Sequence, residues 1–528
     1  GMNSRRPKVT ALTVDGRRYP VRYKVINANS LRIDTQDTAR IKLTVIPGPD
    51  PEDGWWYKFG QHATRIAMSV RNFSFTYKNT YAMTLPGFRP EVGDMLGQKK
   101  HGGFLAPGMD FAFGFTGDGY IDRALQNDWL ICNDSVVSPA SSNALEDLQL
   151  RISLEPIRDL KIDLTANRTR NRSREIQYMF EGMPDTRSGN FSMSIISIGS
   201  AFERPSAGDG YHSGTFERFR RNLDVIRDRV ESQFLGAQYP QGSILAGKTF
   251  DPANGTISKH SPDVMIPAFL AAYTGKSARN SALDFFPSLF SMMPNWRITY
   301  TGLTKIAWFK KNFRSVNLNH AYRSTYSVGS YNTFQSFMSY MGDIGFVEDV
   351  QSGNPIPSSR FDISMVSINE QFSPLIGMDA TLKNGLTAKV EYKTSRILNL
   401  SMSACQLVET ASRDFVIGLG YKIVNFNLFS GRNVKDSKNR VSHDLALRAD
   451  ISFRNQSALC RDIQQGFAQA TNGNKALKIS CSADYTLSRL LTLRLYYDRQ
   501  QNTPLVSSSS YPVVSADFGF SMKFSLTR

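Results

Sequence analysis

The sequence predicts an all-β protein whose long antiparallel strands form a transmembrane β-barrel. Three observations predict this fold class. Apolar and polar residues alternate over long stretches, odd-numbered turns join several of those stretches, and no apolar run has the ~18 residues of a membrane-spanning helix. The longest apolar run, 264–273, has ten residues and contains Pro267. The chain therefore has no candidate for a transmembrane helix, and strands are its only means of crossing a bilayer.

Composition narrows the class further. The 528 residues are 41% hydrophobic, and the 11% of aromatic residues excludes a generally disordered chain. The formal net charge of +17 is compatible with nucleic acid, anionic lipid or simple solubility. The basic residues are spread along the whole chain without a run of five, so we expect no nucleic-acid partner.

Alternation is clearest between residues 366 and 382. Even positions there are apolar except Glu370, and odd positions are polar except Leu375. This is the period of two of a strand with one apolar face. The strands are predicted to be about 12–20 residues long, longer than the ~9–11 residues that cross a membrane. The same division recurs at 148–154, 160–166, 415–423, 445–453, 477–487, 491–497 and 518–526.

Turn lengths predict that consecutive strands are neighbours in an up-and-down meander. Leu382 and Leu386 can pair across Lys383-Asn384-Gly385, since an odd turn keeps two stripes on one face. Other connections are predicted to be longer, at 331–362, 403–412, 426–442, 455–474 and 501–512. A soluble β-sandwich would also show alternation, but such long strands favour the membrane barrel.

Two regions lack the long alternation. Short apolar stripes between residues 8 and 47 predict a small β-sandwich-like module outside the membrane. Apolar residues from Phe216 to Phe234 repeat at helical spacing behind Thr215 as the N-cap, and a second helix is expected to start near Ser261. The predicted organisation is a module at 1–60, barrel strands at 61–199, a partly helical extracellular cap insertion at 200–294, and barrel strands at 295–528 that end in the C-terminal strand.

Chemical motifs are absent from the sequence. The six histidines are scattered, the four cysteines have no metal-ligand spacing, and no G-x-S-x-G occurs. The glycine-rich stretch 208–214 lacks the Gly-Lys-Ser/Thr ending of a phosphate loop. We therefore expect no enzyme, no metal and no cofactor.

Several longer strings resemble the C-terminal part of the SprA/Sov family. They appear in the same order as in that family, and the likeness runs from about residue 60 to Arg528. The strings are 84–88 (TLPGF), 294–300 (PNWRITY), 308–316 (WFKKNFRSV), 320–326 (HAYRSTY), 370–377 (EQFSPLIG) and 502–504 (NTP).

This resemblance implies a place in a much larger protein. Members of the family are outer-membrane barrels of Bacteroidota, the translocons of the type IX secretion system, and they are linked to gliding motility. Their barrel has about 36 strands with a lateral opening and an outer cap. By resemblance, the chain is a C-terminal segment of such a barrel, and 200–294 belongs to the cap. The implied partners are secreted client proteins, a PorV-like outer-membrane protein, a plug protein and outer-membrane lipid.

The polar phase of the strands supplies candidates for lining a lumen. In a large pore these residues would form a hydrated wall and not a catalytic site. Two other functions stay open at this level: an outer-membrane porin or transporter for small solutes, and a soluble basic β-protein that binds polyanions. The candidates are Gln371, Asp379, Lys389, Glu391, Arg448, Asp450, Arg494 and Lys523.

Overall fold

A computed structural model provides the structure of the chain. Among the residues that it describes, no helix is both long and apolar enough to cross a membrane. The described residues are 8–27, 30–34, 40–46, 68–91, 93–117, 119–180, 184–424, 426, 444–487, 491–506 and 511–524.

The N-terminal region is a small β module. Strands β1 (Lys8–Thr13), β2 (Arg18–Tyr19) and β5 (Ile41–Ile46) form a three-stranded antiparallel sheet, in which β1 lies in the middle. Strands β3 (Arg22–Asn27) and β4 (Ser30–Asp34) form a separate hairpin. All five are short, as the spacing of the apolar residues predicts.

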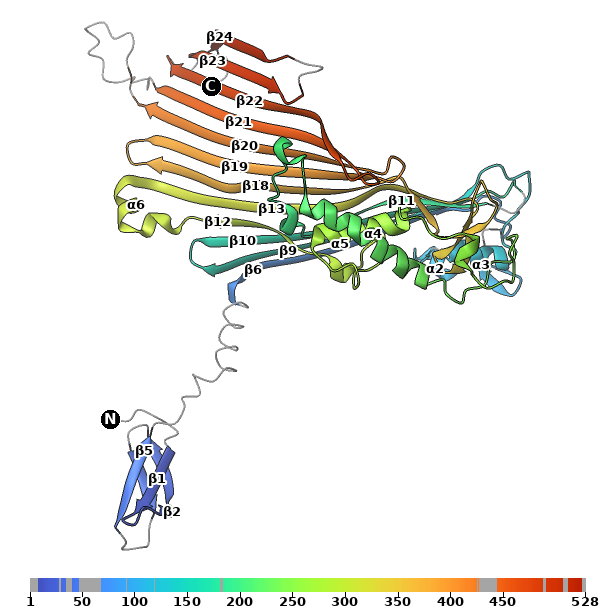
Figure 1. Ribbon diagram of the computed structural model, residues 1–528, viewed down its shortest axis with the longest axis horizontal. Helices are drawn as coiled ribbons and strands as arrows, with labels where there is room; N and C mark the ends of the chain where they lie inside the picture. Colours follow the sequence, from blue (N-terminus) through green and yellow to red (C-terminus); the bar gives the residue numbers. More distant parts are fainter. Residues whose placement is uncertain are drawn as a thin grey trace. The chain divides into compact units, whose positions relative to one another are not determined.

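The main element of the structure is one large antiparallel sheet of fourteen strands (Figure 1). The predicted all-β fold class, with long antiparallel strands and a partly helical insertion, is confirmed. Along the main path the order is β24-β23-β22-β21-β20-β19-β18-β13-β11-β10-β9-β6, while β12 and β17 pair beside it. The strands are β6 (Val70–Thr84), β9 (Ala140–Ile157), β10 (Leu160–Ile176), β11 (Asp185–Ser194), β12 (Asn295–Tyr300), β13 (Phe313–Thr333), β17 (Phe361–Ile363), β18 (Met365–Leu382), β19 (Leu386–Ser401), β20 (Gln406–Ile423), β21 (Leu445–Asp462), β22 (Ala468–Thr486), β23 (Leu491–Pro504) and β24 (Val513–Phe524).

The hairpins agree with the predicted meander at one end of the strands and differ at the other. Residues 383–385 form the turn between β18 and β19, and Gly385 has a φ of +88°, which favours glycine. At the opposite end of the strands, the predicted loops 403–412 and 455–474 are wrong. The connections there are only 402–405 and 463–467, because strand pairing continues after the apolar alternation stops. Nearly all of the predicted loop 426–442 lies outside the described residues.

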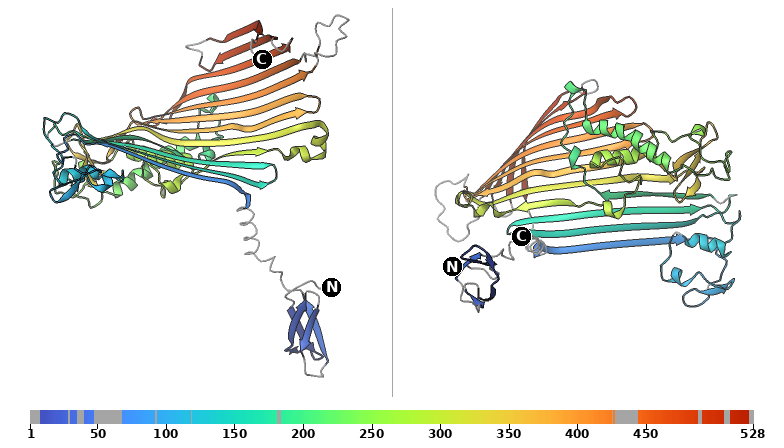
Figure 2. Two further views of the ribbon diagram at one scale, coloured as in Figure 1. Left: turned by 180° about the vertical axis from the view of Figure 1, so that it is seen from behind. Right: turned by 60° about the horizontal axis from the view of Figure 1, so that its bottom comes forward.

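The insertion between β11 and β12 carries two helices. Helix α4 (Gly214–Ser232) buries the predicted apolar stripe, but Ser213, not Thr215, is its N-cap: the Ser213 hydroxyl accepts a hydrogen bond from the Phe216 amide. Helix α5 (Pro262–Thr274) starts where predicted. Both helices lie against one side of the sheet in both views of Figure 2. The insertion also contains the short 3₁₀ helices η2 (Ile198–Ser200), η3 (Ala207–Asp209), η4 (Pro252–Asn254) and η5 (Leu289–Ser291).

Smaller helices and strands lie in the connections between the long strands. Between β6 and β9, residues 85–139 form a compact excursion with its own core around Trp129 and Tyr120. A three-stranded sheet lies between β13 and β17. These elements are β7 (Lys99–His101), β8 (Phe104–Ala106), α2 (Met109–Ala112), α3 (Tyr120–Gln126), η6 (Gly302–Lys305), α6 (Ala307–Asn312), β14 (Met338–Met341), β15 (Ile344–Glu348) and β16 (Pro355–Ser359).

Candidate functional site

The register of the large sheet aligns the apolar stripes of successive strands into continuous rows. Leu419 on β20 lies opposite Ala388 on β19 and Ala449 on β21, and the row continues without interruption to β24. Because paired residues of antiparallel strands share a face, one face of the sheet is apolar across six strands. This row consists of Ala388, Leu419, Ala449, Cys481, Tyr497 and Phe518.

The apolar band is nine residues tall on three adjacent strands, at 415–423, 445–453 and 477–485. Several of its large side chains are exposed: Leu419 is 48% exposed and Phe453 is 50% exposed. A strand needs ~9–11 residues to cross the hydrocarbon core of a membrane. The height of the exposed band therefore matches one bilayer crossing.

The band ends at a common level. On the same face, the next residues after Phe415, Phe453 and Leu477 are Arg413, Asn455 and Lys475, and the register places these three in one row. Such a boundary across adjacent strands is typical of an interface between hydrocarbon and water.

Beyond this boundary, the same face of the sheet is covered. Leu398 and Leu400 on β19 are 0% exposed and share a core cluster with Phe219 of α4 and Phe269 of α5. The helical insertion thus packs on the face that carries the apolar band, at the other end of the strands. The predicted lumen candidates lie on the opposite face, apart from this packing.

Two buried ion pairs lie under the insertion. Glu370 on β18 accepts hydrogen bonds from Arg396 on β19 (2.7 Å) and from Tyr322 (2.8 Å), and its side chain is 2% exposed. Arg461 donates to Glu409 at 3.0 Å and to the Tyr211 carbonyl at 2.7 Å. Because Arg396 also donates to the Ser200 carbonyl, both pairs fasten the insertion to the sheet.

Glu203 organises the start of α4. Its carboxylate accepts hydrogen bonds from the Ser213 hydroxyl (2.5 Å), the Thr215 amide (3.0 Å) and the Thr215 hydroxyl (2.6 Å). Burial acts to raise the pKa of Glu203, but these hydrogen bonds to the charged form outweigh it and leave the pKa below its usual value. A negative charge also complements the dipole at a helix N-terminus.

The predicted lumen residues occupy the polar face of the sheet. Four of them come together near the level of the apolar band. The register pairs Lys389 with Asp379 on β18 and with Gly418 on β20. Asp450 on β21 pairs with Gly418, and its carboxylate occupies the space that a side chain at position 418 would fill. Lys389 also pairs with Glu391 at 3.0 Å. The result is a patch in which both signs of charge alternate.

The other candidates are spread over the same face and join no common centre. Arg494 faces Asp484 at 3.6 Å between β23 and β22. Gln371 lines a separate groove of about 390 Å³ with Arg323 and Arg297. Arg448 lies opposite glycine and serine, and Lys523 lies opposite threonine on β23. These candidates are thus distributed over the polar face, and no group of possible metal ligands was found among the described residues.

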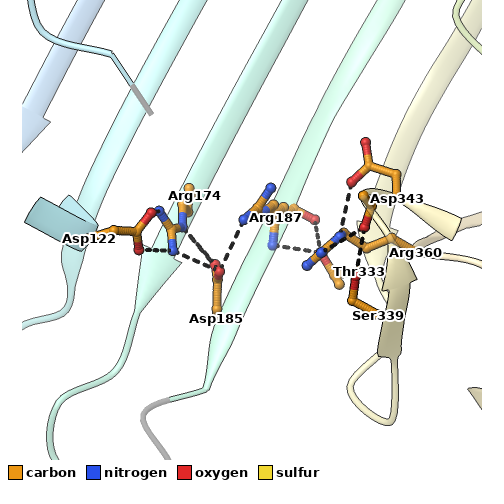
Figure 3. A network of polar contacts seen from close by, with 9 residues as sticks. Asp122, Arg174, Asp185, Arg187, Thr333, Ser339, Asp343 and Arg360 are labelled. Carbon is orange, nitrogen blue, oxygen red and sulfur yellow. Dashed lines mark hydrogen bonds and ion pairs between the residues drawn. The ribbon is translucent and has the colours of Figure 1, made fainter. Parts of the chain in front are cut away.

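Sequence reasoning missed a charged network at the far end of β10 and β11. Arg174 donates to Asp122 (2.9 Å) and to Asp185, and Asp185 also pairs with Arg187 at 3.4 Å (Figure 3). The backbone of Arg187 is held by the Thr333 hydroxyl on β13. The signal was available in the alternating arginines of residues 167–174, NRTRNRSR.

Comparisons with known proteins identify no family. No family model matches the chain, and no curated protein matches it. Among solved structures, the chain is similar to OmpT, an outer membrane protein of Vibrio cholerae in its trimer form. The identity is 10% and the TM-score 0.19, over 73% of this chain and 92% of that one.

Proposed function

We propose that the large sheet is part of the wall of a protein-conducting channel in the outer membrane, which exports client proteins to the cell surface. The observation that carries the proposal is the exposed apolar band, nine residues tall, with a charged face directly behind it. A surface that is apolar on one side and hydrated on the other is what a barrel wall requires. The proposal includes type IX secretion, on the resemblance to the SprA/Sov family.

The width of the sheet supports a large pore. Twelve strands lie along the main path, and among the described residues β6 and β24, at its two ends, do not pair with each other. At about 4.8 Å per strand, the path spans roughly 55 Å without closing. Barrels of about eight strands are filled by side chains, and 16–18 strands enclose an aqueous channel. Among the described residues the sheet is open and wider than a filled barrel of eight strands, which supports a lumen that a polypeptide can enter.

The charges on the polar face favour the passage of a client protein over the binding of a polyanion. Lys389 lies among Asp379, Glu391 and Asp450, so this surface offers neither a basic track nor an acidic one. Such a mixed, hydrated surface gives a moving client few strong contacts. It does not favour a polyanion-binding protein, which would need a continuous basic patch.

Labelling of adjacent residues on β22 tests the membrane assignment. Cys481 lies in the apolar band and Ser482 on the polar face. In a chain with serine at positions 132, 405 and 460, we expect native Cys481 to react in isolated membranes with a lipid-soluble maleimide and not with a charged one. A matched variant with Cys481→Ser and Ser482→Cys should show the reverse. Equal reaction of both sites with the charged reagent would refute the membrane-embedded wall.

Cross-linking tests the passage of a client. A photoreactive amino acid is placed at Lys389 on the polar face or at Leu419 in the apolar band, in cells that secrete through this system. We expect the probe at position 389 to capture secreted protein and the probe at position 419 to capture lipid. If neither position captures a client in protein that is shown to be in the membrane, the export function is refuted. The assignment of the sheet to a barrel wall would be unaffected.

A further inference from the structure

A row of arginines lies on one face of β10 beyond the apolar stripe. Arg168, Arg170, Arg172 and Arg174 alternate with shorter side chains, and β11 adds Arg187 opposite Arg174. The Arg168 guanidinium lies over the Phe191 ring, 5.2 Å from its centroid, and the Arg170 guanidinium lies 4.9 Å from that of Phe286. These contacts place the arginines beside the helical insertion and fix the planes of two guanidinium groups.

The carboxylates of this region are unevenly shared among the arginines. Glu146 pairs with Arg172 at 2.7 Å and Arg168 at 3.6 Å. Arg187 shares Asp185 with Arg174, which holds the carboxylate at the shorter distance, 3.0 Å against 3.4 Å. Among the described residues, Arg170 has no carboxylate within 4.0 Å. In the part of the chain that the structure describes, the charge of Arg170 is therefore not balanced by a neighbouring acid.

These arginines enclose a small cavity. Its volume is about 80 Å³, and Arg170 and Arg187 contribute to its wall from adjacent strands. The Nε atoms of both side chains are buried and have no hydrogen-bond acceptor among the described residues. A buried donor without an acceptor is unfavourable, so these guanidinium groups retain hydrogen-bonding capacity. The other lining residues are Ser142, Arg172, Ser173, Arg174, Ser188, Tyr331, Asp343 and Phe361.

We propose that this cavity binds a phosphate group, either as the free ion or as the terminal group of a phosphomonoester. Guanidinium groups from two strands present several N–H donors at once, which suits the oxygens of a tetrahedral dianion. The hydroxyl of Ser142 can add a neutral donor. The small volume admits the phosphoryl group itself and leaves any attached sugar or lipid outside. The site does not depend on the channel function.

Binding of inorganic phosphate to the full chain in detergent micelles tests the site. We expect binding by isothermal titration at millimolar concentrations or below, and a loss of about tenfold or more in Arg170→Gln and in Arg187→Gln. The matched control is Arg151→Gln, which removes an exposed arginine from neighbouring β9 and should bind phosphate like the unaltered chain. Glucose 1-phosphate separates the two sources: comparable affinity points to a phosphomonoester, and exclusion points to the free ion.

Two results would overturn the site. One is no detectable phosphate binding by the unaltered chain at millimolar concentrations. The other is equal affinity in all three variants. If either glutamine variant loses its folded circular-dichroism spectrum, Arg170→Lys replaces it. That variant keeps the charge but loses the forked donor geometry, so we expect weaker phosphate binding in a folded protein. Unchanged affinity in Arg170→Lys would count against guanidinium recognition.

Discussion

The two halves of the strands use the same face of one sheet in opposite ways. Leu419 on β20 and Leu398 on neighbouring β19 both lie on this face, yet Leu419 is 48% exposed and Leu398 is 0% exposed. Helices α4 and α5 cover the second and leave the first bare. The difference shows that a strand of about 18 residues contains two segments of about nine residues. The apolar face of one segment is exposed and suited to contact with lipid, and the same face of the other segment is covered by helices of the chain.

Charge distribution differs between the halves as well. In the bare half, charged residues such as Lys389 and Asp379 lie on the face opposite the apolar band. In the covered half, Glu370 and Arg396 lie on the same face as the apolar residues and are buried as a pair. The covered half is therefore built like the interior of a water-soluble domain. The bare half is built like the wall of a barrel.

Breaking the buried pair should have the largest effect. Arg396→Leu leaves the Glu370 carboxylate buried without its cation and removes the hydrogen bonds to Ser200. We expect the free energy of unfolding to fall by about 3–5 kcal/mol. Urea unfolding in micelles, followed by tryptophan fluorescence, measures the loss. The control is Lys389→Leu on the polar face of the same strand, with an expected change of about 1 kcal/mol or less. Equal losses would contradict the distinction between the halves.

A matched pair of leucine truncations should have the next largest effect. Leu398→Ala creates a cavity under α4 and α5 and is expected to cost about 3–5 kcal/mol. Leu419→Ala loses the transfer free energy of the same atoms, about 2 kcal/mol, but a detergent or lipid chain fills the space. Unfolding of both variants under identical conditions should give a difference of about 1–3 kcal/mol. A larger cost at Leu419 would mean that protein, not lipid, covers the band.

The same contrast explains how much of the fold was predictable. The stripes at 415–423 and 445–453 were recognised because a lipid-facing band allows few exceptions to the alternation. The strand continuations at 406–412, 455–462 and 468–474 were predicted as loops, since polar side chains interrupt the stripe there. Those residues stay in strands because backbone hydrogen bonds continue to the next strand regardless of side chain.

The candidate sites show a similar limit. The face assigned to Asp379 and Lys389 follows from alternation alone, and their proximity follows from the register once the turn at 383–385 is known. The cavity beside Arg170 could not be predicted, because it depends on how β9, β10, β11 and β13 meet Asp343 and Phe361. Alternating arginines were visible in the sequence, but nothing in it shows how the neighbouring acidic residues are shared among them.

The smallest expected effect is a loss of stability at low pH in the covered half of the strands and the helices above it. Hydrogen bonds from Ser213 and Thr215 leave the pKa of Glu203 below its usual value of 4.5 despite the opposing effect of burial, so the folded state binds its proton less readily than the unfolded state. The stabilisation is present above about pH 4.5 and is lost as the pH falls through the folded-state pKa.

Acidification should therefore loosen the first turn of α4 while the bare half of β20 keeps its protection. Glu203→Gln should destabilise the start of α4 by about 1 kcal/mol at neutral pH and remove most of its acid sensitivity. Hydrogen exchange of peptides from α4 and β20, corrected for intrinsic rates, measures both. Glu231→Gln, at the opposite end of α4, is the control and should keep the acid response. An unchanged acid response in Glu203→Gln would assign the sensitivity to other groups.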